Sequence, residues 1–170
     1  MKKVTFFIFW VCCALTTSAQ QFTVNDIAHA TYRAKGIRGV KPCSDGESYT
    51  QMSDDSKRIV KYSFRTGKEL ETVFDVGTAR ECRFDRFDDY IVSPDDRLIL
   101  IQTETKYMYR RSFTAVYYLF NVKNNKLEPL SEGGPQQVPL FSPDGTQIAF
   151  VRDNNLWLVK LLFGNAESQI

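Results

Sequence analysis

A few residue types in this sequence could do chemistry: two serines in matching motifs and a single histidine. Ser93 and Ser142 each begin a Ser-Pro-Asp run. A serine nucleophile needs a nearby imidazole base, but His29 lies on a predicted short helix with no nucleophile motif beside it. Neither serine stands in the Gly-x-Ser-x-Gly sequence of a nucleophile elbow. We therefore interpret both serines as turn residues, and His29 as a surface or packing residue.

Cysteine and acidic residues could in principle bind a metal. Cys43 and Cys82, the two cysteines outside the apolar N-terminus, lack the Cys-x-x-Cys spacing of a metal site. An exported chain can keep a disulfide, so these two could pair or remain buried free thiols, and both alternatives stay open. The acidic residues at 81, 85, 88 and 89 alternate with arginines and lack calcium-loop spacing. We expect a mixed-charge surface there, and no metal or cofactor.

The N-terminus has the three parts of a secretory signal. Lys2 and Lys3 precede an apolar run from Val4 to Leu15, and Thr17-Ser18-Ala19 supplies small residues for cleavage. The run is too short to span a bilayer comfortably, so we predict a signal peptide at 1–19, export to the periplasm or medium, and no stable membrane span. Its removal takes two lysines and lowers the formal net charge from +2 to zero, which disfavours binding to nucleic acid.

The rest of the chain predicts strands and tight turns after one short helix. Thr23 and Asp26 have the spacing of a capping pair, which predicts a helix from about Asn25 to Tyr32. Beyond Gly36 short runs rich in Val, Ile, Tyr and Phe alternate with turn residues, as in an all-β fold. The expected strands are 48–52, 58–64, 69–74, 90–92, 98–103, 113–122, 127–130, 138–141, 147–152 and 156–163.

A repeat organises these strands. Val92-Ser-Pro-Asp-Asp and Phe141-Ser-Pro-Asp-Gly are 49 residues apart, and each is followed by an alternating strand. We also interpret Met52-Ser-Asp-Asp-Ser as a degenerate earlier copy, 40 residues before the first. Periods of about 40 to 50 residues with four strands each are typical of β-propeller blades. Residues 37–170 would supply about three to four such blades.

Four segments, taken in order, resemble the dipeptidyl peptidase IV family. The most specific is Tyr109-Arg-Arg-Ser-Phe-Thr-Ala115, which is similar to that family's Arg-x-Ser-x-Thr-Ala segment. The others are Phe22–Asp26 with Thr31–Arg33, Tyr90–Asp95 with Leu98–Leu100, and Phe141–Gly145 with Ile148–Trp157. Together they cover nearly all of the chain after the predicted signal. The resemblance implies an N-terminal segment at 20–36 and an incomplete propeller at 37–170.

The resemblance also implies a function. Members of this family are serine exopeptidases that release dipeptides with Pro or Ala in the second position, and they carry the propeller over a C-terminal α/β-hydrolase domain. They are usually homodimers. The family's paired glutamates and Ser-Asp-His triad would lie beyond Ile170, so we expect no peptidase activity from residues 1–170 alone.

Arg110 is the site residue that the resemblance assigns, because it falls on the family arginine that lies near the substrate's carbonyl oxygen. A guanidinium presents several fixed donors and stays charged, which suits it to hold such an oxygen. The alternative without a functional role is that Arg110 and Arg111 are solvated charges on a loop. At the level of the whole chain, the alternative function is a non-catalytic periplasmic propeller of the TolB-like kind that binds proteins.

Overall fold

The computed structural model describes residues 22–33, 36–37 and 39–170. The predicted signal peptide at 1–19 lies outside the described residues. The chain divides between Gly36 and Ile37 into two compact units. Among the described residues no helix is long and apolar enough to cross a bilayer.

The N-terminal unit contains the helix α2, Val24–Ala28. The predicted capping pair is confirmed: the Thr23 side chain accepts from the Asp26 amide, and the Asp26 carboxylate accepts from the Thr23 amide at 3.0 Å. The helix is shorter than the predicted 25–32, because His29 caps it and Ala30 takes a left-handed φ of 50°. His29 is exposed.

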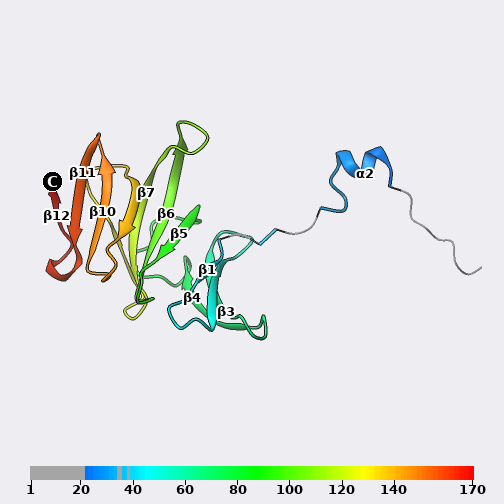
Figure 1. The fold of residues 1–170 in the computed structure, drawn as a ribbon, viewed down its shortest axis with the longest axis horizontal. Helices are drawn as coiled ribbons and strands as arrows, with labels where there is room; N and C mark the ends of the chain where they lie inside the picture. The colour runs from blue at the N-terminus through cyan, green and yellow to red at the C-terminus, as the bar shows by residue number, and fades with distance from the viewer. Residues whose placement is uncertain (1–21, 34–35, 38) are drawn as a thin grey trace, which may run out of the picture. The chain divides into compact units, whose positions relative to one another are not determined.

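The second unit is all β, as predicted (Figure 1). Its described residues form three four-stranded antiparallel sheets, each with its strands in chain order. We call them blades. Blade 1 is β1 Lys41–Pro42, β2 Ser48–Met52, β3 Arg58–Ser63 and β4 Glu69–Asp75; blade 2 is β5 Asp89–Val92, β6 Leu98–Tyr107, β7 Phe113–Asn121 and β8 Lys126–Pro129; blade 3 is β9 Gln137–Phe141, β10 Gln147–Arg152, β11 Asn155–Lys160 and β12 Ala166–Gln169.

The strand predictions differ from the structure mainly at the sheet edges. The short outer strands β1 and β12 were not predicted. The predicted strand 156–163 ends at Lys160, where a 3-10 turn, Leu161–Phe163, redirects the chain toward β12 through Gly164 in a left-handed conformation. β1 has only two residues, Lys-Pro, and β12 is Ala-Glu-Ser-Gln, so neither shows an apolar alternation.

The Ser-Pro-Asp runs are turns, as interpreted, and they join the first strand of a blade to the second. In blade 2 the Ser93 hydroxyl donates to the Asp95 carboxylate at 2.7 Å and accepts from the Leu98 amide at 3.0 Å. Asp96 takes a left-handed φ of 58°, as Gly145 does in blade 3 with 69°. The serines therefore close turns, which agrees with their exclusion as nucleophiles.

The proposed early copy of the motif at Ser53 was wrong. Ser53 lies between the second and third strands of blade 1, whereas Ser93 lies between the first and second of blade 2. The equivalent turn in blade 1 is Cys43-Ser-Asp-Gly46, in which Asp45 accepts from the Ser48 amide at 2.9 Å and Gly46 has a φ of 68°. The period is therefore 50 and then 49 residues, and the Ser53 turn resembles the motif only because it uses the same hydrogen bonds.

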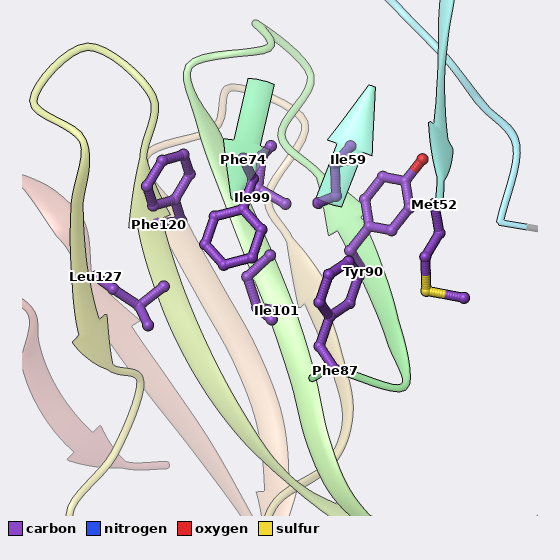
Figure 2. Close-up of a cluster of buried hydrophobic side chains, with 9 residues drawn as sticks. All are labelled: Met52, Ile59, Phe74, Phe87, Tyr90, Ile99, Ile101, Phe120 and Leu127. Atoms are coloured by element: carbon purple, nitrogen blue, oxygen red, sulfur yellow. The ribbon is translucent and has the colours of Figure 1, made fainter. Parts of the chain in front are cut away.

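Blades 1 and 2 share an aromatic core (Figure 2). Phe74 of blade 1 packs edge-on against Phe120 of blade 2, with ring centroids 4.9 Å apart. The buried Tyr90 directs its hydroxyl toward β2, donating to the Gly39 carbonyl and lying 2.9 Å from the Thr50 hydroxyl. Burial and such aromatic pairing each contribute about 1 kcal/mol or more per side chain.

Blade 2 is buried on both faces. Ile99 and Ile101 of β6 face blade 1, while Leu100 belongs to the core shared with blade 3, with Tyr117 and Leu119 of β7. Successive side chains of a strand point to opposite faces, so a strand covered on both sides is apolar throughout, as Leu98–Ile101 is. The central blade is thus a rigid base for whatever its hairpins carry.

Candidate functional site

The β6–β7 hairpin of blade 2 carries Arg110. Its strands have ten and nine residues and are joined by the tip Met108–Ser112, drawn as the open green loop in Figure 1. The Met108 amide donates to the Ser112 carbonyl at 2.8 Å, which closes the tip. At the base of the tip the rings of Tyr107 and Phe113 lie 5.6 Å apart.

The tip is exposed and cationic. Tyr109 is 81% exposed, and both Arg110 and Arg111 are exposed. Within the described part of the chain, none of the ion pairs involves either arginine. A guanidinium without an internal carboxylate keeps its donors for a ligand or for water, and among the described residues this holds for Arg110 and Arg111 alike.

Below the tip the register of β6 and β7 shifts by one residue. Thr103 pairs with Val116, but Lys106 pairs with Thr114, so two residues of β6, Glu104 and Thr105, lie opposite Ala115 alone. Glu104 takes a left-handed φ of 51°. This is a β-bulge, a feature that bends a strand and is common next to functional sites.

A polar chain crosses the otherwise apolar core beside the bulge. The Tyr117 hydroxyl donates to the side-chain oxygen of Gln102 at 3.0 Å, and the Tyr117 backbone amide donates to the side-chain oxygen of Gln136 at 3.0 Å. Gln136 reaches this place because its backbone pairs with Ala115 of β7 in both directions. Burial raises the pKa of Tyr117 well above its usual value, so its hydroxyl stays protonated and donates.

The groove between blades 2 and 3 does not include the Arg110 tip. It measures about 640 Å³ and is lined by Arg97, Lys126, Glu128 and others, but not by Arg110. Its charges satisfy one another: Arg97 pairs with Asp95 at 3.0 Å, and Lys126 pairs with Glu128. Side chains whose charges are already paired have little charge left to bind an ionic ligand.

The other candidate residues are structural. Cys43 and Cys82 are both free thiols in the structure, Cys43 buried and Cys82 half-buried. Burial raises the pKa of the Cys43 thiol, and the Cys82 thiol donates to the Phe84 carbonyl at 3.4 Å. Among the described residues, no group of three or more metal-ligating side chains lies close enough to hold an ion.

Sequence patterns missed the residues around the bulge. Asp88 is exposed, as expected for a mixed-charge surface, but its carboxylate also accepts from the Thr105 amide at 2.9 Å, which the sequence did not predict. Gln102 and Gln136 were not singled out at all. A buried glutamine inside an apolar or turn-rich stretch was the available signal, since buried amides need partners.

Comparison with known proteins agrees with this architecture. Residues 93–170 match the family model described as the dipeptidyl peptidase IV N-terminal region. The crystal structure of Porphyromonas gingivalis dipeptidyl peptidase 4 superposes with a TM-score of 0.80 and 37% identity over 91% of this chain. The chain is similar to the N-terminal propeller region of the dipeptidyl peptidase IV family.

Curated members of the dipeptidyl peptidase IV family give the same result over shorter stretches. A probable dipeptidyl-aminopeptidase B of Emericella nidulans is 46% identical over 41% of this chain. The human prolyl endopeptidase FAP is 27% identical over 80% of it. The chain spans only 8% and 17% of these two relatives and 22% of the Porphyromonas protein. These matches do not favour the TolB-like alternative.

Proposed function

We propose that this chain is the substrate-positioning propeller portion of an exported serine exopeptidase. The enzyme would release dipeptides with Pro or Ala in the second position from peptide N-termini. The proposed organisation is a signal peptide at 1–19, an N-terminal segment at 20–36 and an incomplete propeller at 37–170. A C-terminal α/β-hydrolase domain would carry the catalytic serine, and the complete protein would be a homodimer.

The observation that carries the proposal is Arg110, exposed at the hairpin tip and without an ion-pair partner in the described residues. Family resemblance aligns it with the arginine near the substrate's carbonyl oxygen. In that role Arg110 would hold the oxygen through charge-assisted hydrogen bonds, which are shorter and stronger than neutral ones. It would contribute by orienting the scissile bond rather than by bond chemistry.

The test compares two adjacent arginines in the full-length protein. Hydrolysis of a chromogenic Gly-Pro substrate would be measured for the wild type, Arg110→Ala and Arg111→Ala. We expect Arg110→Ala to lower kcat/KM by about 10- to 100-fold, the equivalent of one lost charged hydrogen bond. Arg111→Ala, which removes the same charge one residue away, should change kcat/KM by less than about threefold. Equal effects of the two changes would contradict the role of Arg110.

Two further measurements bear on the proposed whole. Residues 1–170 alone should release no chromophore, because the nucleophile would lie in the hydrolase domain. Hydrolysis by this polypeptide would contradict the proposal. N-terminal sequencing of the exported protein should begin at Gln20. A retained Met1 would argue against the signal peptide.

A further inference from the structure

The bulge in β6 determines where the Arg110 tip points. An extra residue on one strand bends it and increases its twist, and here the extra residue lies between Thr103 and Lys106. Arg110 lies five positions after Thr105, which is an arm of up to roughly 17 Å in extended chain. A change of about 10° at the bulge would therefore move the tip by roughly 3 Å.

Side chains from two directions hold the bulge at Thr105. The Gln102 amide nitrogen donates to the Thr105 hydroxyl at 2.8 Å. The Asp88 carboxylate, which precedes β5, accepts from the Thr105 backbone amide at 2.9 Å. A second contact, between the Asp88 amide and the Gln102 carbonyl at 2.8 Å, ties these two residues to each other. The backbone of the bulge is thus fixed both from its own strand and from the neighbouring one.

Gln102 is itself held in one orientation. It is 8% exposed, and its side-chain oxygen accepts from the hydroxyl of Tyr117, which is 1% exposed. Because Tyr117 donates, the amide nitrogen of Gln102 is left to face Thr105. An aliphatic side chain would fill the same space without hydrogen bonds, so the buried amide serves the geometry of the bulge rather than the packing of the core.

We propose that Gln102 is a positioning residue for Arg110: by fixing the bulge at Thr105, it sets the direction of the hairpin arm and hence the place where the guanidinium meets the substrate. This rests on the proposed function. A misplacement of about 1 Å at a reacting centre can lower a rate by about 100-fold, so the roughly 17 Å arm makes activity sensitive to a single buried hydrogen bond.

A double-mutant cycle in the full-length protein tests this. Gln102→Leu keeps the side-chain size but loses both hydrogen bonds, and we expect kcat/KM for the Gly-Pro substrate to fall by about three- to tenfold. Gln102→Glu retains acceptors for the Tyr117 and Thr105 hydroxyls and should stay within about twofold of the wild type. In an Arg110→Ala background, Gln102→Leu should cause no further loss.

A matched control separates positioning from general stability. Thr50→Val also removes a buried hydrogen bond, the one between Thr50 of blade 1 and Tyr90 of blade 2, but Thr50 is outside the β6–β7 hairpin. It should lower the melting temperature about as much as Gln102→Leu while leaving kcat/KM unchanged. Should Gln102→Leu fail to fold, Thr105→Val removes the same hydrogen bond at a half-buried position and is expected to give the same loss.

The outcomes separate the two proposals. A loss from Gln102→Leu that persists in the Arg110→Ala background would overturn the positioning role, because the effect would not pass through Arg110. Unchanged activity of a folded Gln102→Leu or Thr105→Val protein would overturn it as well. Full activity of Arg110→Ala would instead overturn the proposed function on which the inference rests.

Discussion

Blades 2 and 3 each place an arginine at the junction of their second and third strands, and the two side chains are in opposite states. Arg152 ends β10, is buried, pairs with Glu167 at 2.6 Å and lies 3.8 Å from the centre of the Trp157 ring. Arg110 lies in the β6–β7 tip, exposed, with no ion pair among the described residues. An arginine at this position is thus bound to other side chains of its own blade in blade 3, and has no ion-pair partner among the described residues in blade 2.

The hairpins differ accordingly. The β10–β11 turn is only Asp153-Asn154, both residues with left-handed φ, which is the tightest connection that suits the twist of two strands. The β6–β7 connection has a five-residue tip and a bulge below it. A blade needs only the short form to hold its sheet together, so the long form points to a task outside the blade.

The largest effect should come from breaking the buried pair in blade 3. Arg152→Ala leaves Glu167 without its cation and removes the stacking on Trp157, so we expect the free energy of unfolding to fall by about 3–5 kcal/mol. Urea denaturation followed by circular dichroism measures this. A loss below about 1 kcal/mol would mean that the pair behaves like a surface salt bridge and that the contrast with Arg110 is smaller than described.

A smaller loss should follow from crowding the same arginine. A Cβ at Gly133 would overlap the Arg152 guanidinium, which Glu167 and the Trp157 ring hold in place, so Gly133→Ala must displace that side chain, and we expect about 1–3 kcal/mol of destabilisation. Gly36→Ala is the control, because none of the described residues lies within 4 Å of a Cβ there. Thermal unfolding of both variants measures this. Equal melting temperatures would show that the Arg152 side chain can move aside without destabilising the protein.

Acid should weaken the blade turns that carry the Ser-Pro-Asp motif. Hydrogen bonds from Ser142 and Ser93 hold the pKa values of Asp144 and Asp95 below the usual range. A carboxyl group with a lowered folded-state pKa adds stability that is present above its unfolded pKa, about 4, and is lost as pH falls through the folded value. Stability should thus decrease below about pH 4, and Asp144→Asn should flatten that decrease. An unaltered profile would contradict the turn assignment.

The smallest effect should be that of the free arginine itself. Arg110 forms no ion pair with any described residue and is exposed, so Arg110→Ala should leave the free energy of unfolding within about 0.5 kcal/mol of the wild type. Urea titration beside Arg152→Ala gives the contrast directly. A loss comparable to that of Arg152→Ala would show that the tip is part of the framework.

Local features were predictable from sequence and distant contacts were not. The capping pair at Thr23 and the Ser-Pro-Asp turns were predicted correctly, because their hydrogen bonds join residues at most five apart. The first blade's turn was missed because Cys43 stands where the other blades have serine, and Ser53 imitates the motif one strand later. The three- to four-blade estimate resolves to three sheets in the described residues.

The site divides in the same way. Arg110 was identified by its motif, whereas the residues that hold its hairpin depend on contacts between distant parts of the chain. Gln136 meets Tyr117 across 19 residues, and Asp88 meets Thr105 across 17. Amide and carboxyl side chains look alike in sequence whether they are solvated or buried. For Gln136 it is the pairing with Ala115 of β7 that buries the side chain.

The segment between blades 1 and 2 has a consequence for how the propeller is put together. Arg80 pairs in parallel with Lys126 of β8, and the Asn125 side chain donates to the Thr78 carbonyl at 2.8 Å. The last strand of blade 2, β8, therefore pairs with a segment that precedes the first strand of the same blade in the sequence. Circular permutants opened between Ala79 and Phe87 should lose this closure, so the seam between these blades is a poor place for new termini.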